Sequence, residues 1–246
     1  MKKSPHKHIL FIIVLLVTIG FISSAFSFWA WHQEGIAFNF KKLIGIIKKD
    51  SIPLEADYWA VEGWNRTMRK CDYHPDIIFF GNSITYYGHW EDEFGSDSCQ
   101  VITLGYPGDN LKGMMKRVDC LKNLQPKKLF LMAGINGLKS MTLSEFTRAY
   151  ANLVDSIGKA TPSTIIYLES ILPVCNSNRY ADNNKIIEAN RIIKDYATNK
   201  EYIYLDIHNL YYTNGGLDKS LSEDGIHLKR EAYKPWYQYL KRFINK

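Results

Sequence analysis

The folded part of this chain lacks net charge, and that absence excludes one large class of proteins. The chain has 246 residues with 31 Lys and Arg and 25 Asp and Glu, and residues 1–49 hold seven of the Lys and one of the Glu. The other 197 residues therefore hold 24 basic and 24 acidic groups. A nucleic-acid-binding domain is expected to carry a basic stripe on its folded surface. We therefore expect no nucleic-acid partner.

The chain also lacks metal-binding motifs and has few cysteines. The chain contains no CxxC and no HExxH motif, so no zinc site is indicated. The four cysteines are Cys71, Cys99, Cys120 and Cys175. In an oxidising compartment four cysteines allow three complete pairings, and the sequence does not choose among them. A disulfide between Cys71 and Cys99 is one possibility, because each precedes a predicted strand.

One long uncharged run stands near the N-terminus. Ile9 to Trp31 is 23 residues without a formal charge, and Lys2, Lys3 and Lys7 precede it. About 20 apolar residues cross a bilayer core as a helix, and the leading lysines favour an N-in orientation. A cleaved signal peptide is the alternative, since residues 25–27 resemble a cleavage site. We favour a retained anchor because the apolar run continues through Trp31.

With this interpretation of the N-terminal run, the chain divides into three parts. Residues 1–31 form a membrane anchor or signal peptide, and residues 32–53 form a basic amphipathic stalk expected to lie on or near the membrane. Residues 54–246 form one folded domain, since 46% hydrophobic residues suffice for a full core. We expect this domain outside the cytoplasm, periplasmic or on the cell surface, and secreted if the N-terminal segment is cleaved.

Apolar runs and helical patterns alternate along the domain. Strands are predicted at residues 76–80, 100–104, 128–133, 164–168 and 202–206. Helices are predicted at residues 111–124, at 142–157 with a Thr142/Glu145 capping box, at 186–197, and from Pro235 onward. This order predicts an α/β fold with a parallel sheet covered on both faces. Ligands bind beyond the carboxyl ends of such strands, so the residues just after each strand are the candidates.

Residues suited to nucleophilic catalysis stand at such positions. Ser83 follows the first strand, and Asp224 and His227 stand three residues apart near the C-terminus. A Ser hydroxyl needs a base to take its proton, His is the usual base, and a carboxylate fixes the tautomer of the imidazole. The ordinary alternatives are a helix cap for Ser83 and a surface turn for the other two.

Candidate donors for an oxyanion follow the next two strands. Gly105 ends the second strand, where a missing side chain lets a backbone N–H approach a substrate closely. Asn136 follows the third strand and offers a side-chain amide. Each of the two is an ordinary turn residue if taken alone.

Taken in order, these blocks resemble the SGNH hydrolases, also called the GDSL esterase/lipase family. The blocks are GNSIT at 81–85, Gly105, GIN at 134–136 and DGIH at 224–227, and the resemblance covers about residues 54–246. It implies a three-layer α/β/α sandwich with a flavodoxin-like, five-stranded parallel sheet and no metal or organic cofactor. It makes Ser83 the nucleophile, His227 the base and Asp224 its partner. The backbone N–H groups of Ser83 and Gly105, with the Asn136 side chain, become the oxyanion hole.

Three residues depart from the family pattern. Asn82 stands where the family has Asp before the nucleophile, Gly137 where Asp often follows the third-block Asn, and Thr103 where Asn stands two before the Gly. None of the three belongs to the implied triad or oxyanion hole. We expect them to affect the position of the loop or the level of activity.

The resemblance implies an exported serine esterase acting on short-chain, foremost acetyl, esters of a small molecule or glycan. An O-acyltransferase of cell-envelope glycan is the first alternative, and a binding module that has lost turnover is the second. Asp206 and His208 form a rival pair that we expect to shape the loop after the fifth strand. Tyr86, Tyr87, His89 and Trp90 either stack on a sugar ring or pack, whereas Tyr211, Tyr212, Trp236, Tyr237 and Tyr239 are assigned to the C-terminal core.

Overall fold

The computed structural model describes residues 74–178 and 180–244. The predicted anchor or signal peptide at 1–31, the stalk at 32–53 and the first residues of the predicted domain lie outside the described residues. Within the described ranges, no helix combines the length and the apolar character needed to span a membrane.

A five-stranded parallel sheet forms the centre of the domain. Its strands are β1 (Ile77–Gly81), β2 (Val101–Gly105), β3 (Lys128–Met132), β4 (Ile165–Glu169) and β5 (Ile203–Leu205). Their order in the sheet is β2-β1-β3-β4-β5, and every neighbouring pair is parallel. The predicted strands and the predicted sheet are thus confirmed.

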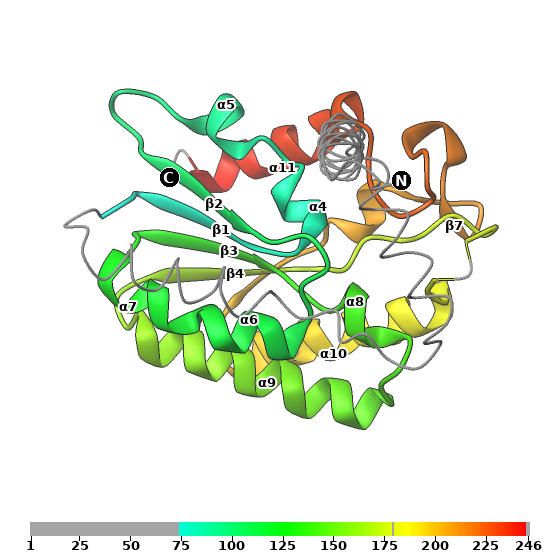
Figure 1. Ribbon diagram of the computed structural model, residues 1–246, viewed down its shortest axis with the longest axis horizontal. Helices are drawn as coiled ribbons and strands as arrows, with labels where there is room; N and C mark the ends of the chain where they lie inside the picture. The colour runs from blue at the N-terminus through cyan, green and yellow to red at the C-terminus, as the bar shows by residue number, and fades with distance from the viewer. Residues whose placement is uncertain (1–73, 179, 245–246) are drawn as a thin grey trace, which may run out of the picture. The chain divides into compact units, whose positions relative to one another are not determined.

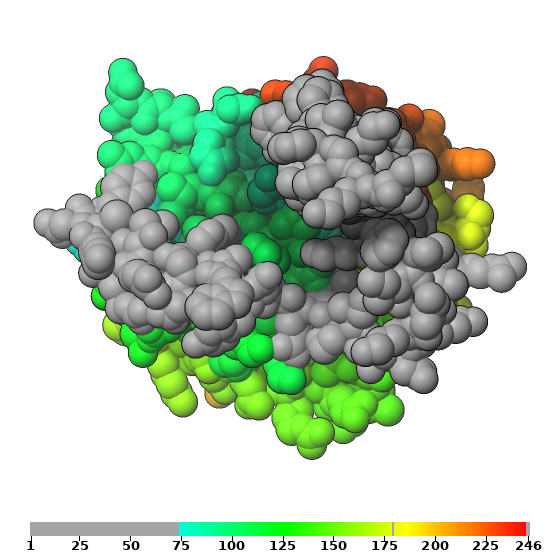
Figure 2. Space-filling model, in the orientation of Figure 1, coloured from blue at the N-terminus to red at the C-terminus, as the bar shows by residue number. Residues whose placement is uncertain are grey.

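Helices cover both faces of this sheet. The helices are α4 (Ser83–Tyr86), α5 (Trp90–Phe94), α6 (Leu111–Arg117), α7 (Leu121–Leu124), α8 (Ile135–Leu138), α9 (Leu143–Ala160), α10 (Asn183–Asn199) and α11 (Lys234–Ile244). Helices α5 and α11 lie on one face, and α6, α9 and α10 lie on the other (Figure 1). The outer surface of α9 runs along the lower edge of the molecule in Figure 2. The fold is therefore the expected three-layer α/β/α sandwich.

Stacked rings fix the packing of the α5/α11 face. Phe79, Phe130 and Tyr167 stand at matching positions of β1, β3 and β4. The ring centroids of Phe79 and Phe130 are 4.9 Å apart, and those of Phe130 and Tyr167 are 4.5 Å apart. Trp90 of α5 stacks on Phe79 at 4.2 Å. Offset aromatic pairs add to the apolar burial of a core, so this row anchors α5 to the sheet soon after α4, which carries Ser83.

The predicted helix boundaries are confirmed at one helix and corrected at another. Thr142 Oγ1 accepts the Glu145 backbone N–H at 3.2 Å, and Glu145 Oε2 accepts that of Thr142 at 2.7 Å, which is the predicted capping box. The predicted helix over 111–124 is wrong as one element. It divides into α6, a 3₁₀ turn (Val118–Cys120) and α7. The break follows Arg117, which is buried and donates hydrogen bonds to strand ends.

The described cysteines are thiols. Cys99, Cys120 and Cys175 are all free, and burial raises the pKa of Cys120 to about 11. The disulfide considered for Cys71 and Cys99 therefore has no support, and Cys71 lies outside the described residues.

A carboxyl group is buried at the end of β4. Glu169 is 1% exposed, and its Oε1 accepts a hydrogen bond from Trp236 Nε1 at 2.9 Å. Burial raises the pKa of Glu169 from 4.5 to about 8, although the bond from Trp236 opposes the rise. In the folded protein this carboxyl is therefore mostly protonated at neutral pH.

We expect Glu169→Gln to flatten the dependence of stability on pH. A carboxyl whose pKa is raised on folding costs nothing below pH 4.5, and its penalty grows as pH rises toward 8. The variant keeps an acceptor for Trp236. Between pH 5 and pH 8 its unfolding free energy should fall by about 2–4 kcal/mol less than that of the wild type. Urea unfolding at the two pH values measures the difference. The exposed substitution Glu188→Gln is the control, and an unchanged pH dependence in Glu169→Gln would contradict the assignment.

Candidate active site

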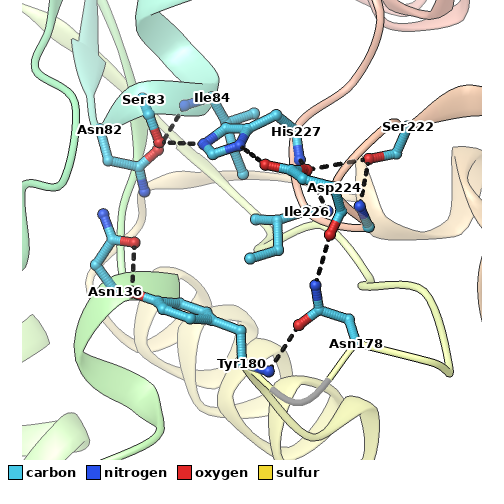
Figure 3. A network of polar contacts seen from close by, with 11 residues as sticks. Asn82, Ser83, Ile84, Asn136, Asn178, Tyr180, Ser222, Asp224, Ile226 and His227 are labelled. Carbon is cyan, nitrogen blue, oxygen red and sulfur yellow. Dashed lines mark hydrogen bonds and ion pairs between the residues drawn. The ribbon is translucent and has the colours of Figure 1, made fainter. Parts of the chain in front are cut away.

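The structure brings Ser83, His227 and Asp224 into one hydrogen-bonded chain (Figure 3). Ser83 Oγ lies 2.8 Å from His227 Nε2, and His227 Nδ1 lies 2.5 Å from Asp224 Oδ2. Ser83 is 6% exposed, whereas the side chains of His227 and Asp224 are 34% and 52% exposed. This is the connectivity that a Ser-His-Asp site requires, and the chemical roles of the three residues stay predictions.

The turn after β1 presents Ser83 at the beginning of a helix. Asn82 has extended backbone angles and caps α4, because its Oδ1 accepts the Ile84 N–H at 2.9 Å. The first backbone N–H groups of a helix have no hydrogen-bond partner within the helix. In α4 the first of these is the N–H of Ser83. Asn82 thus supplies the cap that an Asp would supply at this position. Its Nδ2 is buried and has no hydrogen-bond partner among the described residues.

A tight turn holds His227 against Asp224. Asp224 Oδ1 accepts the backbone N–H groups of Ile226 and His227 at 2.9 and 2.8 Å. Gly225 has a φ of +83°, which favours glycine, and its N–H donates to Ser222 Oγ at 2.9 Å. Burial would raise the pKa of Asp224, but the hydrogen bonds from the His227 side chain and the backbone outweigh it and lower the pKa to about 2. Asp224 is therefore a carboxylate throughout the physiological range.

Gly105 and Asn136 stand at the same edge of the sheet. Gly105 pairs with Gly81 at the strand ends, and a Cβ on it would lie 2.3 Å from the backbone nitrogen of Tyr86. Only glycine allows this approach between β2 and α4. Asn136 belongs to α8, and its Nδ2 donates to the Asp109 carbonyl at 2.7 Å. An amide nitrogen carries two hydrogens, so one N–H of Asn136 remains for a substrate oxyanion.

Two residues that the sequence did not single out donate hydrogen bonds to Asn136 and Asp224. The hydroxyl of Tyr180 donates to Asn136 Oδ1 at 3.1 Å and so sets which way the amide faces. The side chain of Asn178 donates to the Asp224 carbonyl at 2.8 Å and accepts the Tyr180 N–H at 2.6 Å. The segment after β4 therefore contacts both the candidate oxyanion donor Asn136 and the turn of Asp224 (Figure 3). Its place after a strand end was the available signal.

A buried ion pair ties the neighbouring strand ends together. Arg117 lies 2.7 Å from Asp109 Oδ2, and both side chains are almost fully buried. The same guanidinium donates to the carbonyls of Leu104 and Gly81 at 2.9 and 3.0 Å. These carbonyls directly precede Gly105 and Asn82. Arg117 thus ties together the ends of β1 and β2, which are followed by the candidate nucleophile and a candidate oxyanion donor.

The rival pair does not join this site. Asp206 Oδ2 accepts a hydrogen bond from Asn209 Nδ2 at 2.6 Å, and His208 stacks on Tyr212 with centroids 4.8 Å apart. Both line a separate cavity of about 290 Å³ beside α10. They follow β5, which β3 and β4 separate from β1.

The aromatic residues after Ser83 divide into two groups. Trp90 is fully buried and donates from its Nε1 to the Thr85 carbonyl at 2.7 Å, so it is a packing residue. Tyr86 and Tyr87 are 53% and 43% exposed, and Tyr87 meets His227 edge-on at 5.6 Å. The C-terminal residues Tyr211, Trp236 and Tyr237 are buried, and Tyr239 packs against the core.

The departures at Thr103 and Gly137 are accommodated locally. The Thr103 hydroxyl donates to Glu91 of α5 at 2.6 Å, which ties the edge strand β2 to that helix. Gly137 is buried, and a Cβ there would lie 3.1 Å from the Met141 sulfur. Across the described part of the chain, no group of three or more His, Cys, Asp or Glu is arranged to hold a metal ion.

Comparison with known families identifies residues 79–234 as a match to the GDSL-like lipase/acylhydrolase family. This range is well over half of the 246 residues and contains all five residues of the predicted site. A search of curated proteins gave no match.

Solved structures share the fold at low sequence identity. A protein of Streptococcus pneumonia, provisionally described as a platelet activating factor, is 23% identical with a TM-score of 0.68, covering 85% of this chain and 99% of its own. A GDSL-like lipase of Bacteroides thetaiotaomicron is 19% identical with a TM-score of 0.64, covering 75% and 97%. The periplasmic domain of a lipopolysaccharide acetyltransferase of Salmonella ser. Paratyphi A is 16% identical with a TM-score of 0.58, covering 87% and 99%.

Proposed function

The chain belongs to the GDSL-like lipase/acylhydrolase family, and from that membership we propose that it is a serine esterase that hydrolyses short-chain esters, foremost acetyl esters. The observation that carries the proposal is the hydrogen-bonded chain from Ser83 Oγ through His227 to Asp224, with the Asn136 amide at the same sheet edge. The alcohol part of the ester is proposed to be a carbohydrate or another small polar molecule.

The proposed reaction has two halves. Ser83 Oγ attacks the ester carbonyl carbon while His227 Nε2 takes the hydroxyl proton, and Asp224 stabilises the imidazolium. The oxyanion is held by the backbone N–H groups of Ser83 and Gly105 and by the Asn136 amide. The bond to the alcohol oxygen breaks, and the alcohol leaves with the proton from His227. Water then attacks the acyl-serine through the same base and oxyanion donors, releasing the acid and the free serine.

Hydrolysis of activated esters tests this proposal. The full-length chain in mild detergent would be assayed with 4-nitrophenyl acetate, butyrate and decanoate. We expect kcat/KM for acetate to exceed that for decanoate by about tenfold or more, because a short acyl group needs no extended apolar site. A folded protein that hydrolyses none of the three esters would overturn the esterase proposal and favour a binding module.

An O-acyltransferase is the second candidate function. The observation that favours it is the similarity to the Salmonella lipopolysaccharide acetyltransferase domain over 87% of this chain. In that case a sugar hydroxyl, rather than water, takes the acyl group from Ser83. Mass spectrometry of an added oligosaccharide acceptor would detect the acylated sugar. An esterase that releases only free acid in the presence of the acceptor would exclude the transferase.

Tyr180 is proposed as a positioning residue that acts through Asn136. Removing the Asn136 amide with Asn136→Ala is expected to lower kcat by about 10²–10³-fold, as for other oxyanion donors. Tyr180→Phe removes only the hydroxyl that orients this amide, so we expect a loss in kcat of roughly 3- to 10-fold with little change in KM.

The double variant separates positioning from a general structural role. If Tyr180 acts through Asn136, adding Tyr180→Phe to Asn136→Ala should lower kcat no further. Multiplicative losses in the double variant would contradict this role for Tyr180.

We also propose that the esterase domain works outside the cytoplasm and is held at a membrane. The support is the uncharged run at Ile9–Trp31 with lysines before it, which lies outside the described residues. Membrane fractionation of cells tests the proposal. Recovery of the intact chain in the soluble cytoplasmic fraction would contradict it.

A further inference from the structure

The segment after β4 contacts both parts of the candidate site, although none of the predicted site residues belongs to it (Figure 3). The Tyr180 hydroxyl donates to Asn136 Oδ1, and the Asn178 side chain donates to the Asp224 carbonyl. Asn178 Oδ1 in turn accepts the Tyr180 backbone N–H. The candidate oxyanion donor and the turn of Asp224 are therefore bonded to the same segment, and the position of that segment sets the distance between them.

Backbone contacts attach the turn of Asp224 to this segment. The Cys175 backbone N–H donates to the Gly225 carbonyl at 2.9 Å. A Cβ on Gly225 would lie 3.0 Å from Asn178 Nδ2 and 3.2 Å from Cys175 Cβ, so the two pieces of chain are in close contact. With the bond from Asn178 to the Asp224 carbonyl, the segment binds two successive carbonyls of the turn. A shift of the segment would therefore move the turn that carries His227.

One side-chain amide at the start of α10 holds this segment. Asn183 Oδ1 accepts the Val174 backbone N–H at 2.9 Å, and Asn183 Nδ2 donates to the Val174 carbonyl at 2.8 Å. The amide thus pairs with both backbone groups of one residue, as an opposite residue does in an antiparallel sheet. Val174 is buried, so losing either bond would leave a backbone group without a partner away from water. Asn183 therefore fixes the position of Val174.

A second asparagine of α10 makes the same kind of pair two turns along the helix. Asn190 Oδ1 accepts the Ile171 backbone N–H at 2.7 Å, and Asn190 Nδ2 donates to the Ile171 carbonyl at 2.9 Å. Asn183 and Asn190 are seven residues apart, so they stand on one face of the helix. The segment is therefore bonded to α10 at two points, Ile171 and Val174, before it reaches the turn of Asp224.

A hairpin at residues 212–217 contacts the same amide. Asn183 Nδ2 lies 3.1 Å from the Gly215 carbonyl, to which it also donates. A Cβ on Gly216 would lie 2.7 Å from the Val174 carbonyl oxygen and 2.8 Å from Asn183 Nδ2. Glycine is therefore required for the hairpin to lie this close to the pair. The Asn183 side chain thus joins three pieces of chain: α10, the segment after β4 and the hairpin.

We propose that Asn183 is a positioning residue of the esterase. It acts through Val174 and the following backbone, and it holds the turn of Asp224 and the Asn136 amide at the separation that the reaction needs. Catalytic groups contribute fully only when the surrounding residues fix their positions. This inference rests on the proposed esterase function and adds to that site a residue that contacts neither the candidate triad nor Asn136 in the described structure.

Kinetics of Asn183 variants in the full-length chain test this role. Asn183→Ala removes both bonds to Val174, and we expect kcat for 4-nitrophenyl acetate to fall by about fivefold or more while KM stays within about twofold. Asn184→Ala is the matched control and should keep wild-type kcat. Asn184 is the next residue of α10, is exposed, and its side chain has no hydrogen bond to a described residue.

Two further variants separate positioning from a loss of folding. Asn183→Asp keeps the acceptor for the Val174 N–H and places an acid in the first turn of α10, where the helix dipole favours it. It loses the donor to the Val174 carbonyl, so its kcat should fall although the protein stays folded. Asn178→Ala cuts the bond from the segment to the Asp224 carbonyl. If Asn183 acts through this segment, the double variant Asn178→Ala/Asn183→Ala should lose less than the product of the two single losses.

The possible failures are distinguishable. Wild-type turnover with unchanged kcat in folded Asn183→Ala or Asn183→Asp would overturn the positioning role and leave the esterase intact. A loss confined to KM, or multiplicative losses in the double variant, would do the same. Absence of turnover in the folded wild-type protein would overturn the esterase proposal, and the inference on Asn183 with it.

Discussion

Replacing Ser83 with alanine is expected to lower kcat for 4-nitrophenyl acetate by at least about 10⁴-fold. The reason is that Ser83 Oγ, 2.8 Å from His227 Nε2, is the one hydroxyl in the site paired with a base among the described residues. Alanine removes the atom that forms the acyl-enzyme and keeps the backbone N–H at the start of α4. The loss should therefore appear in kcat, with little change in the circular dichroism spectrum or the melting temperature.

Ser98→Ala is the matched control for this experiment. Ser98 is exposed in the segment between α5 and β2, and among the described residues its hydroxyl hydrogen-bonds only with Ser96 Oγ, at 3.3 Å. It removes the same atom elsewhere in the domain and should keep wild-type kcat. Equal activity in Ser83→Ala and Ser98→Ala would exclude Ser83 as the nucleophile.

Asp224→Asn is expected to lower kcat by about 10³–10⁴-fold while the protein stays folded. The carboxamide oxygen can still accept the backbone N–H groups of Ile226 and His227, so the turn is preserved. Its NH₂ group would then face His227 Nδ1 in place of an acceptor. That pairing favours the tautomer with the proton on Nε2, which cannot take the proton of Ser83. The base is lost although the positions of the side chains in the site are preserved.

Asp206→Asn provides the comparison with the rival pair. Asp206 lies beside His208 in sequence, yet both line the cavity beside α10 and neither contacts the Ser83 site in the described structure. We expect kcat within about twofold of wild type for this variant. A loss comparable to that of Asp224→Asn would show that the wrong acid–histidine pair had been assigned.

The sheet and the positions of the site residues could be predicted because they depend on local sequence signals. Each strand is a short apolar run that ends near glycine or a polar residue, and parallel strands bring the residues after their carboxyl ends to one edge. Ser83, Gly105 and Asn136 each stand at or just after a strand end, so their gathering required no knowledge of side-chain contacts. Asp224 and His227 belong to one turn, and the structure places them against Ser83.

The bracing contacts could not be predicted because they join residues far apart in the chain. Tyr180 meets Asn136 across 44 positions, and Asn178 meets Asp224 across 46. Nothing in the local pattern around 176–180 distinguishes these residues from an ordinary polar turn. The burial of Arg117 could not be predicted for a different reason, because a basic residue in a helical pattern normally faces solvent. Its burial against Asp109 and two strand-end carbonyls depends on the packed sheet.

These contacts link the strand ends and loops that carry the candidate site residues. Arg117 holds the ends of β1 and β2, and the segment after β4 joins the Asn136 amide to the Asp224 turn. Preorganised donors contribute to catalysis only when surrounding residues fix their orientation. We therefore expect the residues around Ser83 to affect the rate as well as the stability.

Covalent labelling shows directly whether His227 and Asp224 activate Ser83 as a nucleophile. The full-length chain would be incubated with a fluorophosphonate, digested, and sequenced by mass spectrometry. We expect one phosphonyl adduct, on Ser83, formed quickly in the wild type and far more slowly in His227→Ala. A folded wild-type protein that gains no adduct, or gains it on a residue other than Ser83, would show that Ser83 is not an activated nucleophile.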